Sequence, residues 1–125
     1  MKNILVVDDS TTMRRMVISS LRTLEQVVFQ EAANGLDAIE KLAIGSVALM
    51  ILDLNMPDMH GMEVIAFVRK QATFHELPII VLTTRGDDAS RAAALAAGAS
   101  LYITKPFESA HLAESAQALL YADAK

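Results

Sequence analysis

The sequence predicts an α/β fold: a doubly wound parallel sheet of five strands, with five helices covering its two faces. Two observations predict it. Short runs of apolar and β-branched residues alternate with longer segments whose apolar residues recur at helical spacing, and capping or turn residues separate the two kinds of segment. The runs expected to form strands are residues 4–7, 27–29, 48–52, 79–82 and 101–104.

The strand runs are apolar on consecutive residues rather than on alternate ones. Ile4–Val7 and Ile79–Leu82 are unbroken apolar runs, as is Ala48–Leu52. Strands of this kind are covered by helices on both faces, as in a parallel sheet whose right-handed crossovers place helices above and below it. The run at residues 27–29 is followed by Gln30 and Glu31, and we expect it to be an edge strand.

The five intervening segments have the lengths and boundary residues of helices. In the first, Met13, Val17 and Leu21 follow helical spacing, and Leu112, Ala116 and Leu120 do so in the last. The expected boundary residues are Ser10 or Thr11 before the first helix, Asn34-Gly35 at the start of the second, Gly61 at the start of the third, Gly98 at the end of the fourth and Ser109 as the cap of the fifth.

Composition limits the possible functions. The 125 residues suit one domain, which we expect to span residues 1–125, and 53% of them are hydrophobic. Eleven basic and 15 acidic residues give a net charge of −4 without a basic face, which argues against nucleic-acid binding. No apolar run is long enough for membrane insertion. The absence of cysteine and of a signal peptide predicts a cytoplasmic protein.

Polar side chains follow four of the five predicted strands. They are Asp8 and Asp9 after the first strand, Asp53 and Asn55 after the third, Thr83 at the end of the fourth and Lys105 after the fifth. The carboxyl ends of parallel strands lie at one edge of the sheet, which is where open α/β sheets bind ligands. We therefore expect these residues to form a single site.

The expected site has the composition of a phosphoryl-transfer pocket. Three carboxylates a few ångströms apart repel one another, and a divalent cation removes that repulsion. Oxygen ligands without His or Cys select a hard ion, Mg²⁺ or alternatively Mn²⁺. With the ammonium group of Lys105 and the hydroxyl of Thr83, such a pocket suits transfer of a phosphoryl group to a carboxylate.

These motifs resemble those of bacterial response regulator receiver domains, and most of all the single-domain, chemotaxis-type (CheY-like) members. The resemblance covers essentially the whole chain and rests on Asp8-Asp9, on Asp53-Leu54-Asn55-Met56-Pro57 with Gly61, on Thr83, and on Tyr102-Ile103-Thr104-Lys105-Pro106-Phe107. It implies a flavodoxin-like fold with strand order 2-1-3-4-5. It also implies a phosphorelay function with no enzymatic turnover beyond self-catalysed phosphotransfer and autodephosphorylation.

By this resemblance Asp53 is the phosphoacceptor. Asp9 and Asp53 would bind Mg²⁺ through their carboxylates, Asp8 mainly through a metal-bound water, and Asn55 through its backbone carbonyl. Thr83 and Lys105 would each bind a phosphoryl oxygen; together with Asp53 they form the expected catalytic set. The peptide bond between Lys105 and Pro106 is expected to be cis.

The resemblance also implies partners. The phosphodonor would be a phosphohistidine on a sensor histidine kinase. Tyr102 would be a switch residue that turns inward as Thr83 moves toward the phosphoryl group. The response would reach a target protein through the face formed by the fourth helix, the fifth strand and the fifth helix. Because no effector segment follows the fifth helix, we expect the output to be non-covalent binding to another protein. We also expect the protein to be a monomer.

Other interpretations of the same residues remain open at this point. Asp8-Asp9 taken alone is equally explained as a helix-capping pair, and Lys105-Pro106 taken alone as a turn. Rival functions are a phosphatase acting through phospho-aspartate, a flavodoxin-like electron carrier and a degenerate receiver used for interaction alone. The remaining polar residues of interest, expected to be solvated or on a helix surface, are His60, His75, His111, Arg14 and Arg15.

Overall fold

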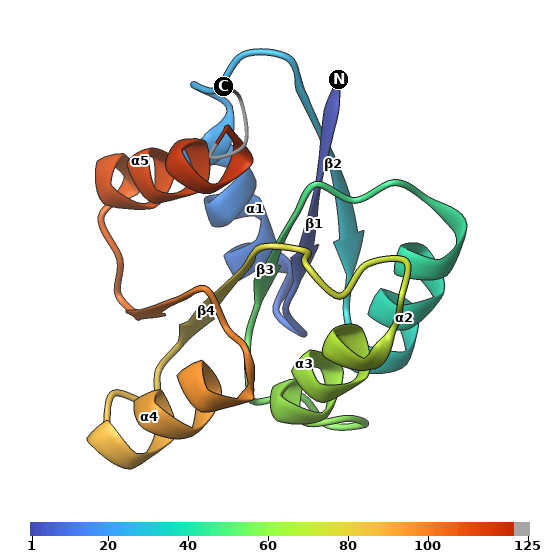
Figure 1. Ribbon diagram of the computed structural model, residues 1–125. Coiled ribbons are helices and arrows are strands. Elements are labelled where there is room, and N and C mark those ends of the chain that lie inside the picture. Colours follow the sequence, from blue (N-terminus) through green and yellow to red (C-terminus); the bar gives the residue numbers. More distant parts are fainter. Residues whose placement is uncertain (122–125) are drawn as a thin grey trace.

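A computed structural model describes residues 1–121, in which five strands and five helices alternate (Figure 1). Residues 122–125, part of the domain predicted over 1–125, lie outside the described residues. The elements are β1 (Lys2–Val7), α1 (Thr11–Leu21), β2 (Val27–Ala32), α2 (Gly35–Ile44), β3 (Leu49–Leu52), α3 (Gly61–Lys70), β4 (Ile79–Thr83), α4 (Asp88–Ala97), β5 (Leu101–Thr104) and α5 (Ser109–Leu120).

The five strands form one parallel sheet in the order β2-β1-β3-β4-β5. This confirms the predicted fold class and strand order, and it places β2 at an edge. Val7 lies beside Leu52 in the register of β1 and β3, and Thr83 lies beside Thr104 in that of β4 and β5. The residues that follow these four strands therefore emerge at one edge of the sheet, as the sequence predicted.

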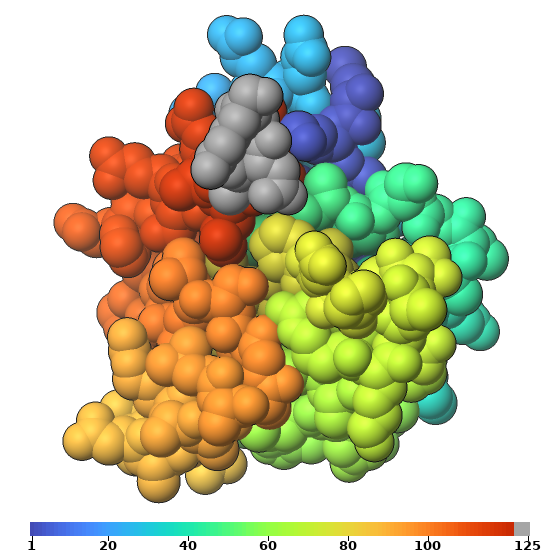
Figure 2. Space-filling view, viewed as in Figure 1, coloured from blue at the N-terminus to red at the C-terminus, as the bar shows by residue number. Residues whose placement is uncertain are grey.

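Each face of the sheet is covered by its own group of helices. Leu5 and Val7 of β1 belong to the core beneath α2, α3 and α4, whereas Ile4 and Val6 belong to the core beneath α1 and α5. Figure 1 shows the two groups on opposite sides of the strands, and in the space-filling view α3 and α4 meet on the side turned to the viewer (Figure 2). Burial on both faces explains why the central strands are apolar throughout.

The predicted helix boundaries are largely confirmed. Ser10 accepts a hydrogen bond from the backbone N–H of Met13 and caps α1, and Asn34 caps α2 in the same way. Gly98 ends α4 with φ +122°, a conformation that L side chains rarely adopt. The expected cap Ser109 is wrong: it is the first residue of α5, and its hydroxyl hydrogen-bonds that of Ser20 at 2.8 Å.

In the part of the chain that the structure describes, no helix combines the length and the apolar character needed to cross a membrane.

Candidate functional site

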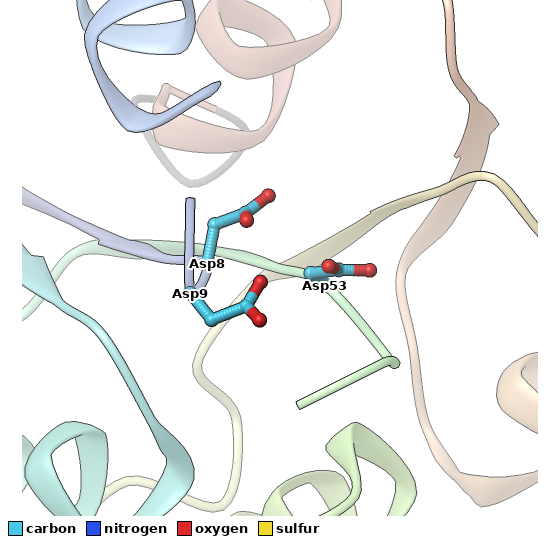
Figure 3. Close-up of side chains that lie close together, drawn as sticks. All are labelled: Asp8, Asp9 and Asp53. Carbon is cyan, nitrogen blue, oxygen red and sulfur yellow. The ribbon is translucent and has the colours of Figure 1, made fainter. Parts of the chain in front are cut away.

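Three aspartates meet at the carboxyl edge of the sheet. Asp8 and Asp9 follow β1, and Asp53 follows β3 (Figure 3). Carboxylate oxygens of the three lie within 4.8 Å of one another. Asp8 and Asp53 are only 4% and 6% exposed, whereas Asp9 is open to solvent. Two of the three charges are thus held out of water, which is costly without compensation.

Lys105 supplies part of that compensation. It follows β5, and its Nζ atom lies 2.9 Å from Asp8 Oδ2 and 3.6 Å from Asp53 Oδ2. Its peptide bond with Pro106 is cis, as expected. One ammonium group cannot balance three carboxylates, so the cluster retains an excess of negative charge.

The backbone around Asp53 is tightly held. Its N–H donates to the carbonyl of Val7 at 3.0 Å, and its Oδ1 accepts the N–H of Asn55 at 3.3 Å. A Cβ atom at Gly61 would lie 2.7 Å from the carbonyl oxygen of Asp53 and 2.7 Å from Leu54 Cα, so the start of α3 fits against this backbone only as glycine. The position of the Asp53 carboxylate is therefore fixed by β1, by its own loop and by α3.

Burial raises the pKa of the Asp53 carboxyl above its ordinary value of 3.8. The positive charge of Lys105 and the hydrogen bond from Asn55 act in the opposite direction, the charge of Asp8 adds to the rise, and the Thr83 hydroxyl opposes it. The native fold therefore disfavours the charged form of this carboxylate. A second positive charge beside it, in addition to Lys105, would lower that pKa.

Asp8 is held by contacts from the start of α1. Its Oδ1 accepts the N–H of Ser10 at 2.9 Å, and its carbonyl oxygen accepts Arg14 Nη1 at 2.6 Å. Arg14 also pairs with Glu31 of β2, Nε to Oε1 at 2.8 Å. The expectation that Arg14 is merely a helix-surface residue is wrong, because its guanidinium joins α1, β2 and the loop that carries the acidic pair.

Thr83 and Tyr102 lie on the neighbouring strands β4 and β5. Thr83 is fully buried, and its Oγ1 accepts the N–H of Arg85 at 3.4 Å. Tyr102 is 5% exposed, with its hydroxyl donating to the Arg85 carbonyl. The ring expected to turn inward on phosphorylation thus already lies inward here, and both side chains contact the loop between β4 and α4.

His60 has a role that the sequence analysis missed. It is half-buried rather than solvated, and its Nδ1 accepts the N–H of Met62, which caps α3. The signal was present in the sequence: a helix that opens at Gly61 makes residue 60 its cap. Histidine is rarer at helix caps than Ser, Thr, Asp or Asn. The residue type at position 60 therefore did not indicate a cap.

The arrangement of donors at this edge fits a small, hard divalent cation. Carboxylate oxygens from three residues approach one point, two of them are buried, and one lysine leaves their charge partly unbalanced. Such oxygen-only ligand sets are typical of Mg²⁺ and Mn²⁺. The Asn55 carbonyl, also expected to be a ligand, belongs to the same loop as Asp53.

Comparisons with known proteins agree with this geometry. The family model for the response regulator receiver domain matches residues 4–117. The chain is 42% identical to the chemotaxis protein CheY1 of Helicobacter pylori over 118 residues, which are 94% of this chain and 95% of that protein. The structure of the chemotaxis response regulator CheY4 of Vibrio cholerae superposes with a TM-score of 0.86 at 33% identity, covering 95% of this chain and 98% of that one.

A third relative is the response regulator Rcp1 in its Mn²⁺-bound form. It has a TM-score of 0.80 and 27% identity, and the match covers 97% of this chain and 93% of Rcp1. The fold and the acidic site thus define a receiver domain, and this chain belongs to the response regulator receiver family. It is a signalling domain of the chemotaxis type, a response regulator of two-component signalling.

Proposed function

We propose that Asp53 is the phosphoacceptor and that a sensor histidine kinase is the phosphodonor. The observation that carries the proposal is the meeting of Asp8, Asp53, Thr83 and Lys105 from four strand ends at one edge of the sheet. A buried carboxylate beside an ammonium group and a hydroxyl has the surroundings that transfer to an acidic side chain requires.

In the proposed reaction an Oδ atom of Asp53 attacks the phosphorus of a phosphohistidine. The P–N bond breaks, its electron pair goes to the imidazole nitrogen, and an aspartyl phosphate forms. Lys105 and Thr83 bind the oxygens of the transferred group, while Val7 and Gly61 keep Asp53 in place through their backbone contacts. Hydrolysis of the aspartyl phosphate by water returns the chain to its starting state, so the chemistry is self-catalysed phosphotransfer and autodephosphorylation.

We propose Mg²⁺, with Mn²⁺ as a substitute, as the cation of the site. Asp9 and Asp53 would hold it by their carboxylates, Asp8 through water and Asn55 by its carbonyl. When bound, the cation neutralises the carboxylates and the approaching phosphoryl oxygens. The close approach of the three carboxylates supports this assignment, as does the Mn²⁺-bound form of the relative Rcp1.

We further propose that the signal leaves through the face formed by α4, β5 and α5. Tyr102 of β5 is buried, with the guanidinium of Arg91 on α4 5.6 Å from its ring centroid, and Leu95 of α4 and Leu101 of β5 are exposed. A protein target that binds this face would sense the position of Tyr102. We also propose that the protein is a cytoplasmic monomer; the absence of cysteine supports the intracellular setting.

Labelling with a small phosphodonor tests this proposal. We expect acetyl phosphate with Mg²⁺ to add the mass of one phosphoryl group to the wild type, measured on the intact protein. Asp53→Asn should stay unlabelled, and EDTA should prevent labelling of the wild type. Equal labelling of the wild type and of Asp53→Asn would contradict the assignment.

A further inference from the structure

The loop between β3 and α3, residues 53–60, carries two of the proposed metal ligands, Asp53 and Asn55, at its start. Its tip reaches a helix that is distant in the sequence. Asp58 Oδ1 accepts the backbone N–H of Gly35 at 3.1 Å, and Asp58 Oδ2 accepts that of Leu36 at 3.1 Å. We call these two hydrogen bonds the Asp58 bridge. They tie the loop to the first turn of α2.

The start of α2 is built to receive this carboxylate. An α-helix leaves its first N–H groups without partners inside the helix. Asn34 accepts the N–H of Asp37, and the Asp58 bridge satisfies those of Gly35 and Leu36. A negative charge is also favoured at this end of the helix dipole.

The ionisation of Asp58 agrees with this arrangement. Asp58 is exposed; partial desolvation raises the pKa of its carboxyl, but hydrogen bonds from the N–H groups of Leu36, Gly35 and Met59 together outweigh that effect and lower the pKa below 3.8. The bridge is therefore made by a carboxylate at neutral pH. An Asn side chain at position 58 could supply only one of the two accepting oxygens.

A second contact joins the same two elements. Met59 is partly buried and packs against the core beneath α2, α3 and α4. Its side chain lies so close to Gly35 that a Cβ atom there would be 2.7 Å from Met59 Cβ. The loop tip is thus held to α2 by an apolar contact as well as by the Asp58 bridge.

The middle of the loop is also held by Leu54 and Met56, the neighbours of Asn55, which are buried in the core beneath α2, α3 and α4. Asn55 donates its N–H to Asp53 at the beginning of the loop, and Gly61 donates to the Leu54 carbonyl at its end. Asn55 and Pro57 are exposed. Contacts at the tip add to these restraints on the exposed backbone at Asn55.

We propose that Asp58 is a positioning residue for the phosphoacceptor loop: by bridging to α2 it fixes the backbone carbonyl of Asn55 relative to the Asp53 carboxylate, and so preorganises the cation site. This inference rests on the proposed function. Residues that orient metal ligands without touching the metal affect affinity by about 10- to 100-fold in other proteins. Asp58 acts here at the lower end of that range, because Met59 holds the same loop.

The test compares Asp58→Ala with a matched control, Asn34→Ala. The control removes a cap from the same turn of α2 but leaves the loop untouched. Three quantities are measured: backbone amide exchange in metal-free protein, Mg²⁺ affinity by calorimetry, and the rate of labelling by acetyl phosphate as a function of Mg²⁺ concentration.

For Asp58→Ala we expect faster exchange at the amides of Gly35, Leu36 and Asn55, and roughly tenfold weaker Mg²⁺ binding. The labelling rate at saturating Mg²⁺ should stay close to that of the wild type. Asn34→Ala should speed exchange at Asp37 and leave Mg²⁺ affinity unchanged. Asp58→Asn, with one accepting oxygen, should fall between wild type and Asp58→Ala.

Unchanged Mg²⁺ affinity in Asp58→Ala, or an equal loss in Asn34→Ala, would overturn the inference, since the effect would then be absent or due to helix fraying. If Asp53 is not the phosphoacceptor, the experiments give a different set of results. In that case the wild type itself would take no label at Asp53, while amide exchange at Asn55 in the metal-free protein would still test the bridge.

Discussion

The interiors of the three central strands and their carboxyl ends are equally shielded from water, yet they carry opposite kinds of residue. In β3, Ile51 and Leu52 are at most 2% exposed, and the next residue, Asp53, is only 6% exposed. The same change from an apolar to a charged buried residue occurs at the end of β1, where Asp8 follows Val7. The interiors stabilise the fold by burying apolar surface, whereas the ends hold charge that the fold must tolerate for the site to exist.

Substitution inside a strand is expected to give the largest change. Ile51 packs in the core beneath α1 and α5, and Ile51→Ala removes buried methyl groups and leaves a cavity. We expect the free energy of unfolding to fall by about 3–4 kcal/mol, measured by urea denaturation. Ile44→Ala, at an 83% exposed position, is the control and should change it by less than about 0.5 kcal/mol. A similar fall in the free energy of unfolding of both variants would contradict the claim that buried strand residues stabilise the fold more than exposed residues do.

Thr83→Ala tests whether the end of β4 carries the signal. The variant should still accept a phosphoryl group at Asp53 but lose most of the phosphorylation-dependent gain in target affinity. That gain is expected to be on the order of 1–3 kcal/mol, the usual size of a coupling free energy. It is measured by titrating the target with and without beryllofluoride, an acyl-phosphate mimic, while the Tyr102 ring resonances are followed. The full gain in Thr83→Ala would show that another face transmits the signal.

Asp53→Asn should change stability in the opposite direction from Ile51→Ala. In metal-free protein it removes one of three close negative charges, and we expect the free energy of unfolding to rise by about 1–2 kcal/mol. The same substitution should weaken Mg²⁺ binding and so remove the stabilisation that Mg²⁺ gives the wild type. Urea denaturation with EDTA and with Mg²⁺ measures both effects. A loss of stability in EDTA would mean that Lys105 already compensates the charge of Asp53.

The stability difference between the wild type and Asp53→Asn should depend on pH, because the pKa of Asp53 is raised in the folded protein. A carboxyl with a raised folded-state pKa contributes stability that is present below its unfolded value and is lost as pH rises through the folded value. In EDTA the wild type should therefore lose stability relative to Asp53→Asn as the pH rises from acid through the raised folded-state pKa of Asp53. Near the acid end the wild-type carboxyl is neutral, and the two proteins should become similar. A stability difference between the wild type and Asp53→Asn that stays constant with pH would contradict a raised pKa for Asp53.

The sequence was sufficient to predict the features that depend on local pattern. Consecutive apolar residues predicted the central strands and their burial, and the polar residues at the ends of four strands predicted the edge where Asp8, Asp53 and Lys105 meet. The first prediction follows from helices covering both faces of a parallel sheet, and the second from the geometry that directs every carboxyl end to the same edge. Asn34 and Gly98 were recognisable because capping depends on residues close in sequence.

Features that depend on distant contacts were not predictable in this way. Ser109 was expected to cap α5 but instead bonds Ser20, 89 positions away. The helical pattern places Arg14 on a helix surface, although its guanidinium binds Glu31 and the Asp8 carbonyl. Asp58 bonds an N–H group 23 residues before it. In each case the partner is brought near by the sheet and its helices, and no local pattern specifies it.

Locating the phosphoryl group tests the central claim most directly. The wild type is labelled with acetyl phosphate and Mg²⁺ and treated with borohydride, which reduces an aspartyl phosphate to homoserine, and the peptides are then sequenced by mass spectrometry. We predict homoserine at position 53 and unchanged aspartate at positions 8, 9 and 58. Homoserine at position 8 or 9, or labelled protein without homoserine at 53, would contradict the assignment of Asp53 as the phosphoacceptor.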